Sequence, residues 1–367
     1  MMPIDLTSQP RKVLLGMSGG VDSSVAAFLL LQQGWEVFGL SLLTDEATRS
    51  SIQDAEAISR QLGISWELLD IRQRFHQLVV DDFIAAYSSG QTPNPCVVCN
   101  PLVKFNALLS AADRLGCQAV ATGHYASIQR VRETGRLALA KTEAGLKDQT
   151  YFMYRLSQDQ LARIVFPLSG MNKPAVRAIA ANAGLSGSGG SDLAQKPDSQ
   201  DCCFIPDGDY ARYIEVSLKK TGDPAMMQLT KPGIVLDTSG RPVGTHKGLI
   251  HYTLGQRKGF QVQTTERLFV IDRDPVNNTL TVGPFSAVLR QEIKVIEPVY
   301  SGLAAIKPGE KLEARIRNSA KEAPCIVYPL QDGSLQVIFD QPVSAPAPGQ
   351  SCVFYRDSLI MAGGFIG

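Results

Sequence analysis

Apolar and polar positions follow two different patterns in the two halves of the chain. Between residues 12 and 122, short apolar runs alternate with segments whose apolar positions recur at helical spacing. This alternation predicts an α/β domain in which helices cover a parallel sheet. The predicted strands are 12–16, 36–43, 65–70 and 119–122, and the predicted helices, each followed by a glycine, are 23–33, 51–62 and 105–115.

The pattern changes near residue 185, where the glycine- and serine-rich stretch Gly184–Asp192 predicts a mobile segment. Beyond about residue 215, short alternating runs between turn residues predict small β domains or a barrel. These runs are 268–272, 279–282, 311–316 and 335–339. Because 367 residues exceed one average core, we expect several domains. The expected domains are an α/β domain over 1–210, a small central domain over 211–286 and a C-terminal β-barrel over 287–367.

Composition and charge narrow the class of protein without identifying a ligand. Hydrophobic residues make up 44% of the chain and charged residues 19%, which is typical of a globular protein and argues against disorder. The formal net charge of +1 gives no global basic excess, although local basic patches suffice to bind nucleic acid. The N-terminus lacks the apolar core of a signal peptide, and no apolar run approaches the roughly 20 residues of a membrane span. We therefore expect a cytoplasmic protein with no membrane partner.

The segment Gly16–Ser24, GMSGGVDSS, combines a strand end, a glycine-rich turn and a helix start. Glycines let the backbone approach phosphates, and the exposed amides of a helix start favour anions. No GK[ST] follows at the spacing of a Walker loop. Bare phosphate would repel Asp22, so this carboxylate is expected to hold phosphate-bound Mg²⁺. The alternative is a bare glycine turn. The candidate ATP-binding residues are Gly16, Met17, Ser18, Gly19, Gly20, Val21, Asp22 and Ser23.

Seven cysteines are an odd number, and their spacing does not indicate the disulfide framework of a secreted protein. Cys96 and Cys99 form a CxxC pair in TPNPCVVCN, whose prolines are expected to hold the segment off regular structure as a presented loop. Cys202 and Cys203 stand together in DSQDCCFI. A thiolate nucleophile needs solvent access and a depressed pKa, which loops beside helix starts provide. Sulfur transfer suits two cysteines, because one carries a persulfide and the other attacks it and leaves a disulfide.

Two metal sites are alternatives to this chemistry. The cysteines at 96, 99, 202 and 203 are numerous enough for structural zinc, although vicinal cysteines rarely ligate one ion together. Cys96, Cys99 and Cys203 are also enough for a [4Fe–4S] cluster that leaves one iron open. Both alternatives stay open at this point. The other three cysteines lie in apolar or strand-like runs and are expected to be packing residues: Cys117, Cys325 and Cys352.

The string SGGVDSS resembles the pyrophosphatase (PP) loop of N-type ATP pyrophosphatases, an adenine nucleotide alpha hydrolase-like fold, which adenylate an oxygen at the expense of ATP. Together with six further strings, the chain resembles the bacterial tRNA-specific 2-thiouridylase family, MnmA, along essentially its whole length. The further strings, in order, are TPNPCVVCN with LVKF, ATGHYA, KDQTYFMYRL, KPDSQDCCFI, YTLGQRKGF and PGQSCVFY.

The resemblance implies that ATP adenylates the C2 oxygen of the wobble uridine in tRNA and that persulfide sulfur then displaces AMP. It implies that Cys203 carries the persulfide and that Cys99 attacks it. Cys96 stands where family members carry Asp or Cys, which puts a carboxylate base at this position in doubt and leaves a cluster-ligand role open. Cys202 is interpreted as a bystander. The implied partners are the anticodon arm of tRNA and a sulfur donor protein, such as a cysteine desulfurase or a persulfide relay.

The resemblance also implies binding residues outside the glycine loop. For ATP they are Leu42 and Gly123. For tRNA they are Asn94, Pro95, Cys96, His124, Lys147, Asp148, Gln149, Arg317, Asn318 and Gln350. His124 follows a predicted strand, where α/β sheets place ligand residues, and the alternative is a packed structural histidine. This chain departs from the family at Thr44–Glu46, where Lys-Asn-Trp is usual, and at Asn318, where a tyrosine would stack on a base.

Two other functions are compatible with parts of this pattern. An adenylating synthetase that acts on a small metabolite would share the glycine loop but would need neither the CxxC pair nor Cys203. A non-catalytic RNA-binding metalloprotein would share the cysteines but would release no pyrophosphate.

Overall fold

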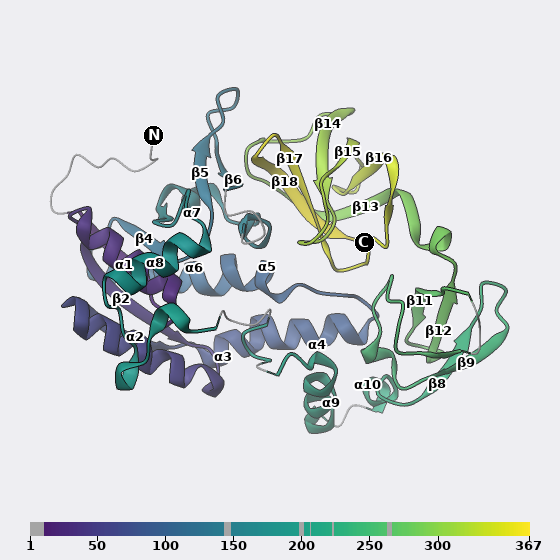
Figure 1. Ribbon diagram of the computed structural model, residues 1–367. Helices are drawn as coiled ribbons and strands as arrows, with labels where there is room; N and C mark the ends of the chain where they lie inside the picture. Colours follow the sequence, from purple (N-terminus) through teal and green to yellow (C-terminus); the bar gives the residue numbers. More distant parts are fainter. Residues whose placement is uncertain (1–10, 143–147, 198–201, 206, 222–223, 263–265) are drawn as a thin grey trace.

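Five short runs rich in aliphatic residues form a parallel sheet in the N-terminal part of the molecule (Figure 1). The computed structural model describes residues 11–142, 148–197, 202–205, 207–221, 224–262 and 266–367. The strand order is β3-β2-β1-β4-β7, and all four pairings are parallel. The strands are β1 (Lys12–Gly16), β2 (Glu36–Leu43), β3 (Ser65–Asp70), β4 (Ala119–Thr122) and β7 (Ile164–Val165).

Helices cover both faces of this sheet, which is why its central strands are apolar on both sides. Val13 and Leu15 of β1 belong to one core cluster with α1 and α8, while Leu14 belongs to a second cluster with α6. Both clusters are fully buried at these positions. The helices of this domain are α1 (Val21–Gln32), α2 (Arg49–Leu62), α3 (Arg72–Phe75), α4 (Asp81–Ser88), α5 (Pro95–Cys99), α6 (Phe105–Leu115), α7 (Gln158–Ala162) and α8 (Lys173–Asn182).

One helical stretch, Pro95–Leu115, runs without a break through α5, a π-helical turn at Asn100–Lys104, and α6. By length and composition alone, its 21 residues could cross a membrane. Half of the stretch is buried inside the molecule, and α6 packs against β1 and β4. It is therefore weak evidence for a membrane span, because a core helix of an α/β domain meets the same test.

The middle of the chain forms a second, mostly antiparallel sheet of order β10-β9-β8-β12-β11, in which only β8 and β12 pair in parallel. Its core is continuous with side chains from α4 and α9, so the middle sheet packs directly on the N-terminal domain. The elements are α9 (Tyr210–Thr221), α10 (Pro224–Gln228), β8 (Gly233–Leu236), β9 (Pro242–His246), β10 (Gln261–Val262), β11 (Phe269–Asp274) and β12 (Thr279–Gly283).

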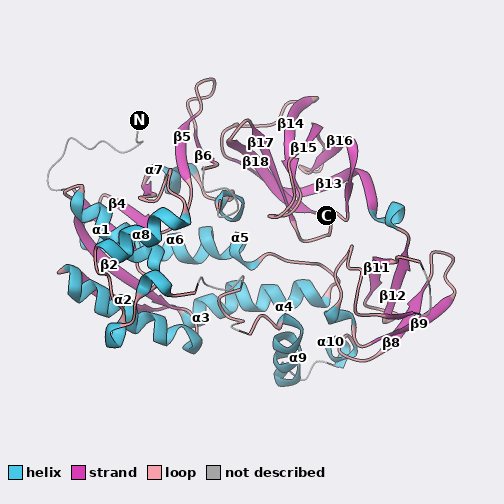
Figure 2. Ribbon diagram, in the orientation of Figure 1, coloured by secondary structure: helices cyan, strands magenta, loops and turns pink. Residues whose placement is uncertain are grey.

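The C-terminal strands close into a barrel, because β13 pairs with both β16 and β18 (Figure 2). A hairpin of the N-terminal domain, β5 (Ser127–Arg130) and β6 (Leu137–Ala140), extends this sheet through a bridge between Ala140 and Leu359. Val131 and Ala138 of the hairpin lie in the barrel core. The barrel strands are β13 (Leu289–Tyr300), β14 (Glu310–Arg315), β15 (Ala323–Pro329), β16 (Leu335–Ser344), β17 (Ser351–Arg356) and β18 (Leu359–Ile366).

Most of the predicted strands and helices are confirmed. The four predicted strands of the first half match β1 to β4 residue for residue, and the later runs fall on β11, β12, β14 and β16. Gly184–Asp192, predicted to be mobile, contains a turn closed by a bridge between Ser186 and Asp192, and its mobility stays a prediction. The turn is held in place because the backbone N–H and the hydroxyl of Ser188 both donate to Asp54 of α2. The domain limits at 210 and 286 stay predictions.

Candidate active site

The glycine-rich loop lies at the carboxyl edge of the parallel sheet, at the point where the strand order reverses. β1 is flanked by β2 on one side and by β4 on the other, and ligands of open α/β sheets bind at such a point. Gly16 is the register partner of Thr122, so the chains after β1 and β4 leave the sheet side by side. The loop at 17–23 is therefore brought beside Gly123, as the ATP prediction requires. Leu42, near the end of the neighbouring β2, is half-buried at the same edge.

Two positions in this region must be glycine, because the backbone of a neighbouring element lies too close to leave room for a Cβ. Gly19 has φ +71, and a Cβ there would lie 1.7 Å from the carbonyl oxygen of Ser51 in α2. Gly123 lies against the loop itself, and a Cβ there would lie 2.7 Å from backbone atoms of Asp22 and Ser23. Side chains at either position would push the loop off α2 or off β4. The loop is therefore clamped between two neighbouring elements before any ligand binds.

The hydroxyl groups of the loop shape it and leave the helix start open. The Ser23 hydroxyl accepts from the backbone N–H of Ser18 at 3.2 Å and donates to the carbonyl of Gly20 at 3.1 Å. The N-cap residue of α1 is Gly20, which has no side chain to bond the first amides of the helix. Those amides are the groups that bind phosphate oxygens at helix starts.

Asp22 is paired with a lysine that the sequence pattern did not reveal. The Lys173 amine, at the start of α8, lies 2.9 and 2.8 Å from the two carboxylate oxygens of Asp22, and the Tyr125 hydroxyl donates to the same carboxylate at 2.7 Å. The Lys173 side chain is 13% exposed. In this structure the carboxylate predicted to hold Mg²⁺ is thus neutralised by an ammonium group, and its Mg²⁺ role stays a prediction.

A second lysine contacts the glycine loop through its backbone. The Lys196 amine donates to the carbonyl of Gly19 at 2.9 Å and to the carboxylate of Asp54 at 2.6 Å. Burial alone would raise the pKa of Asp54, but hydrogen bonds from Lys196 and Ser188 outweigh it and leave that pKa below its usual value. Through these two hydrogen bonds Lys196 joins the glycine loop to Asp54 of α2.

The CxxC segment is helical, and the prediction that it forms an irregular loop is wrong. Pro95–Cys99 forms the first turn of the long helix, and the Asn94 side chain accepts from the backbone N–H of Cys96 at 3.2 Å. Pro95 occupies the first helical position, where its missing N–H costs nothing and its fixed φ suits the helix. The Asn-Pro pair was therefore a helix start rather than a helix breaker. Asn94 and Pro95, predicted to contact tRNA, hold the turn that presents Cys96.

Cys99 and Cys203 are brought together from segments far apart in the sequence. Cys99 packs on the same core cluster as Phe204 and Ile205, which directly follow Cys203, and a charge on Cys203 would raise the pKa of Cys99. Cys203 follows a stretch outside the described residues, and the next residue, Phe204, fixes its position. The Phe204 ring packs edge-on against Phe75, Phe83 and Tyr213, with ring centroids 5.3 to 5.6 Å away.

The expectation that these thiols have depressed pKa values is wrong for this structure. Burial raises the pKa of Cys99 to about 12, although Lys104 and its backbone amide oppose the shift. Burial also raises the pKa of Cys203, whose thiol is desolvated by the surrounding chain even though the residue as a whole is exposed. Lys104 opposes this second shift as well, while Asp45 adds to it. Desolvation exceeds the attraction of one cation, so both thiols are protonated near neutral pH.

His124 faces the same lysine. Its Nδ1 lies 2.6 Å from the Thr122 hydroxyl, and the rings of Phe105 and Phe166 lie 6.0 and 6.4 Å away. Burial, and then the charge of Lys104, lower its pKa well below the usual value. His124 is therefore a neutral imidazole at the carboxyl edge, available for hydrogen bonding rather than for ion pairing.

The cysteines do not form a metal site in this arrangement. Within the described part of the chain, no group of three or more His, Cys, Asp or Glu side chains is placed to hold a metal ion. None of the seven cysteines forms a disulfide here. Cys117, Cys325 and Cys352 are buried in core clusters, which confirms their predicted packing role.

Three family models match successive parts of the chain. A tRNA methyl transferase HUP domain matches residues 11–207, a tRNA methyl transferase PRC-barrel domain matches residues 226–284, and an aminomethyltransferase beta-barrel domain matches residues 290–366. A tRNA-specific 2-thiouridylase MnmA of Acetivibrio thermocellus is 40% identical over 97% of this chain and 99% of that protein. The MnmA of Clostridioides difficile is 37% identical over 97% and 98%, respectively. The chain belongs to the MnmA family.

Solved structures resemble the chain more distantly. The U34-tRNA thiolase NcsA of Methanococcus maripaludis with its [4Fe-4S] cluster is 19% identical over 61% of this chain and 71% of that chain, with a TM-score of 0.36. The NMN synthetase of Francisella tularensis is 18% identical over 58% and 78%, with the same TM-score. At these TM-scores the likeness carries no argument about the site.

Membership in the MnmA family confirms several predictions made from the sequence. The family, the fold class of a parallel-sheet domain followed by a middle domain and a C-terminal barrel, and the activity class of an ATP-using tRNA 2-thiouridylase are all as predicted. The roles of individual residues stay predictions. A [4Fe-4S] cluster is named only for NcsA among these relatives, and its presence here also stays a prediction.

The predicted tRNA residues before the barrel lie in different environments. Asp148 is buried, receives a hydrogen bond from Thr150 at 2.7 Å and lies 4.0 Å from the Arg315 guanidinium, so it faces the barrel in this structure. Burial raises the pKa of Asp148. Gln149 accepts from the backbone N–H of Tyr125 at 3.0 Å and so joins the string to the residue that holds Asp22. Lys147 lies outside the described residues.

The predicted tRNA residues of the barrel also have different surroundings. Arg317 donates to the carbonyls of Ser344 and Ala345 at 2.8 and 3.0 Å, and the neighbouring Asn318 is exposed. Gln350 donates to the carbonyl of Thr92 at 2.8 Å, two residues before Asn94. The structure thus brings Gln350 and the CxxC helix start together, while Arg317 is held by the barrel itself.

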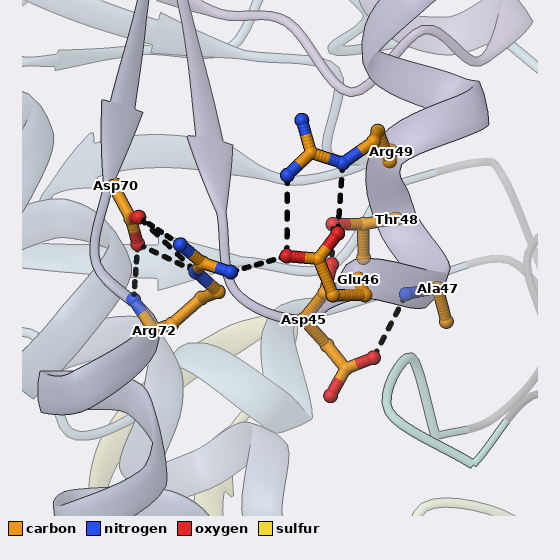
Figure 3. Close-up of polar contacts among 7 residues, drawn as sticks. All are labelled: Asp45, Glu46, Ala47, Thr48, Arg49, Asp70 and Arg72. Atoms are coloured by element: carbon orange, nitrogen blue, oxygen red, sulfur yellow. Dashed lines mark hydrogen bonds and ion pairs between the residues drawn. The ribbon is translucent and has the colours of Figure 1, made fainter.

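The loop that departs from the family, Thr44–Glu46, forms a network of exposed ion pairs (Figure 3). Glu46 pairs with Arg49 and Arg72, and Asp70 pairs with Arg72. Asp45 points away from these pairs and accepts from the backbone N–H of Ala47 at 2.8 Å. Exposed pairs of this kind contribute little stability. Arg72 links Glu46, which follows β2, to Asp70 at the end of β3, and the charge of the neighbouring Asp45 helps raise the pKa of Cys203.

Sequence reasoning missed several cations that the fold brings to the site. Lys104 and Lys196 lie inside strings that resemble the family, LVKF and KPDSQDCCFI, and could have been noticed there. Lys173 had no local signal apart from its place at a helix start, with Asn172 as cap. The partners of Lys173 and Lys196 could not be predicted, because Asp22 and Gly19 lie more than a hundred residues away in the sequence.

Proposed function

We propose that this chain converts the wobble uridine of tRNA to 2-thiouridine in two half-reactions at one edge of the parallel sheet. In the first, the C2 oxygen of the uridine attacks the α phosphorus of ATP, pyrophosphate leaves, and an adenylated uridine forms. In the second, sulfur replaces the oxygen at C2 and AMP leaves. Membership in the MnmA family supports the overall reaction.

The geometry of the glycine loop supports the first half-reaction. The open amides of α1 suit a phosphate group, and the loop is clamped by Gly19 and Gly123 against α2 and β4. Lys173 and Lys196 add two ammonium groups beside the loop. Preorganised cations and amides stabilise charge that develops on phosphate oxygens without reorganisation during the reaction.

Cys99 packs on the same core cluster as Phe204 and Ile205, the two residues that directly follow Cys203, and this shared location is the observation on which the second half-reaction depends most. Cys203 receives a persulfide sulfur from a donor protein. The terminal sulfur attacks C2, and AMP departs with the original oxygen. The Cys99 thiolate then attacks the inner sulfur of Cys203, so the sulfur–sulfur bond to the uridine breaks and 2-thiouridine is released. The two electrons come from the two thiols, which end as a disulfide that a thiol reductant resets.

The remaining parts of the proposal concern partners and compartment. The middle domain and the barrel hold the anticodon arm, and exposed Arg257 and Lys258 between glycines suit phosphate contacts. Loss of an aromatic at Asn318 removes one base-stacking contact. The sulfur donor is a cysteine desulfurase or persulfide relay, and the reaction is placed in a reducing cytoplasm, where thiols are regenerated.

A single-turnover assay on anaerobically purified protein tests the mechanism. Iron and sulfide are measured first, and the protein then receives tRNA, ATP and a persulfide donor. Cys99→Ser and Cys203→Ser are expected to abolish 2-thiouridine formation while tRNA-dependent pyrophosphate release continues. Cys202→Ser serves as the matched control and is expected to retain thiolation. Thiolation that strictly requires iron, or that survives both substitutions, would overturn the roles given to Cys99 and Cys203.

A further inference from the structure

The short segment Gly90–Asn94 connects α4 to the helix that carries Cys96 and Cys99, and both later domains bind it. From the barrel, Gln350 donates to the carbonyl of Thr92, and the Thr92 N–H donates to the carbonyl of Pro348, each at 2.8 Å. From the middle domain, the Arg273 guanidinium donates to the Thr92 hydroxyl at 3.1 Å and to the carbonyl of Gly90. The segment is thus held from two sides before the helix begins.

The backbone packing around this segment leaves little room for displacement. Gly90 has φ +77, and a Cβ there would lie 3.3 Å from the ring of Pro275, next to β11. Gly349 has φ +84, and a Cβ there would lie 3.0 Å from Gln91 and 3.2 Å from the backbone nitrogen of Thr92. Since the backbone at Gly90 and Gly349 approaches its neighbours so closely that an added Cβ would be crowded, a shift of either domain is passed to the segment.

Arg273 is an unusual residue to find at such a place. It is only 7% exposed, and its guanidinium forms no ion pair with a carboxylate in the part of the chain that the structure describes. Its acceptors are two backbone carbonyls, of Tyr252 at 2.6 Å and of Gly90, and one hydroxyl, of Thr92. Burial lowers its pKa, against the influence of Tyr87, Tyr210 and the carboxylate of Asp272. A buried cation held by neutral acceptors is costly, so geometric specificity is the reason to keep one.

The position of the segment determines where Cys99 stands. Asn94 ends the segment and caps the helix by accepting from Cys96, and Pro95 fixes the first helical φ. The helix continues without a break from Pro95 to Leu115, and Asn100 in its π-helical turn donates to the carbonyl of Phe152 at 2.9 Å. A displacement at Thr92 therefore moves the Cys99 sulfur relative to Cys203, which is anchored separately through Phe204.

We propose that Arg273 is a positioning residue for sulfur transfer, which sets the distance between Cys99 and Cys203 from the middle domain through Thr92. The inference rests on the proposed function, because it assigns to Arg273 the alignment of that reaction's two sulfurs. The inference goes beyond the proposed function because it gives the middle domain a role in sulfur transfer in addition to tRNA binding.

The test compares Arg273→Met, Arg273→Lys and Thr92→Val with the wild type and with a control, Arg155→Met. Arg155 also links the N-terminal domain to another domain, contacting Glu297 at 3.3 Å and lying over the Phe365 ring, but it does not contact the segment. Four quantities are measured: the single-turnover rate of thiolation, tRNA-dependent pyrophosphate release, tRNA affinity, and the yield of the Cys99–Cys203 disulfide under controlled oxidation, quantified by mass spectrometry of the linked peptides.

Arg273→Met is expected to slow thiolation roughly 10- to 100-fold, because a displacement of about 1 Å at a reacting group has effects of this size. The disulfide yield falls in parallel, while pyrophosphate release and tRNA affinity change less than about twofold, because the glycine loop does not contact Arg273. Arg273→Lys, which keeps the charge but not the fork of donors, gives an intermediate loss. Thr92→Val shifts both sulfur readouts in the same direction, and Arg155→Met shifts neither.

Two outcomes would overturn the proposal: an unchanged disulfide yield in Arg273→Met, or a loss of pyrophosphate release as large as the loss of thiolation. If Arg273→Met does not fold, Thr92→Val decides, since it removes one acceptor at constant volume. A wild-type protein that forms no 2-thiouridine would contradict the proposed function instead, and the disulfide readout would still decide the role of Arg273.

Discussion

The glycine loop after β1 is surrounded by groups that are already paired, whereas the two cysteines lie among groups that oppose their ionisation. At the loop, Lys173 and Lys196 each contact a carboxylate within 3 Å, so the charges are balanced and the backbone is fixed. At the cysteines, burial raises both pKa values, and Lys104 is the cation that opposes the shift at each thiol. One half of the site is thus prepared for its ligand, while the other rests in a protonated, weakly nucleophilic form.

This difference matches the order of the proposed reaction. Adenylation comes first and needs a fixed phosphate site, which preorganised dipoles and cations supply. Sulfur transfer comes second, and a thiol that is protonated at rest does not react early with oxidants or with free disulfides. The charge of Lys104 also lowers the pKa of His124, so the same lysine influences both the two cysteines and the carboxyl edge of the sheet.

The largest expected effect concerns the reactivity of Cys99. With a pKa of about 12, the thiolate fraction at pH 8 is roughly a thousandfold lower than that of an unperturbed thiol near 9. Alkylation of Cys99 by iodoacetamide in the folded protein should therefore be slower by two to three orders of magnitude than in the urea-unfolded chain, and should accelerate as pH rises toward 12. The rate is followed by mass spectrometry of the peptide.

Lys104→Met should slow this alkylation further, because it removes the cation that opposes the shift. Lys219→Met, an exposed lysine of α9, is the matched control and should leave the rate unchanged. Alkylation of folded wild-type Cys99 at the rate of an ordinary thiol would abolish the contrast between the two halves of the site.

The second prediction tests the rigidity of the glycine loop. Gly19→Ala should reduce ATP affinity by about 100-fold or more, because a Cβ cannot occupy a position 1.7 Å from the Ser51 oxygen and the loop must leave α2. Gly20→Ala is the control, since its Cβ would contact only the Ser18 hydroxyl at 3.5 Å and its φ is −93. Calorimetric titration with ATP measures both. Equal affinities of the two variants would show that the loop adapts freely and is not preorganised.

The third and smallest prediction concerns the pair that fixes the loop to α2. Lys196→Met should lower the free energy of unfolding at pH 7 by about 1–3 kcal/mol, because it leaves the Asp54 carboxylate without its charged partner. The pKa of Asp54 is lowered in the folded state, so its contribution is present above the unfolded value of 3.8 and is lost as pH falls through the folded value.

Urea unfolding of the wild type and of Lys196→Met should therefore give a difference that is constant near neutrality and shrinks below about pH 4. Ser217→Ala, on the separate helix α9, controls for a general effect of substitution. A difference that persists unchanged at pH 3 would mean that Lys196 acts through packing and not through its charge.

Local patterns were sufficient to predict the sheet and the glycine loop. The strands β1 to β4 are short apolar runs bounded by glycine or polar residues, and their pattern does not depend on distant contacts. The loop carries its own signal, because glycine is needed where φ is positive and the backbone is close to a neighbour. The wrong prediction of an irregular loop at Pro95 could have been avoided from the local sequence, since Asn followed by Pro is a common helix start.

The electrostatics of the site could not be predicted from the sequence, because they arise from contacts between distant segments. Lys173 and Asp22 are separated by 151 residues, and the Lys196 amine contacts a carbonyl 177 residues away. The raised pKa of Cys99 depends on the apolar cluster that α4, α9 and the middle sheet form around it. A CxxC motif at a helix start suggests a reactive thiolate, and only the surrounding desolvation reverses that expectation.

The β5–β6 hairpin has a consequence for the chain during its synthesis on the ribosome. Val131 and Ala138 belong to the core of a barrel whose strands begin at Leu289, so they emerge long before the surface that buries them. N-terminal domains fold first as a chain is made. Apolar side chains that are not yet buried bind chaperones or aggregate with other nascent chains. Chains that stop before the barrel is complete would keep the apolar side chains of this hairpin exposed. Chaperones and proteases would then recognise these chains as incompletely folded.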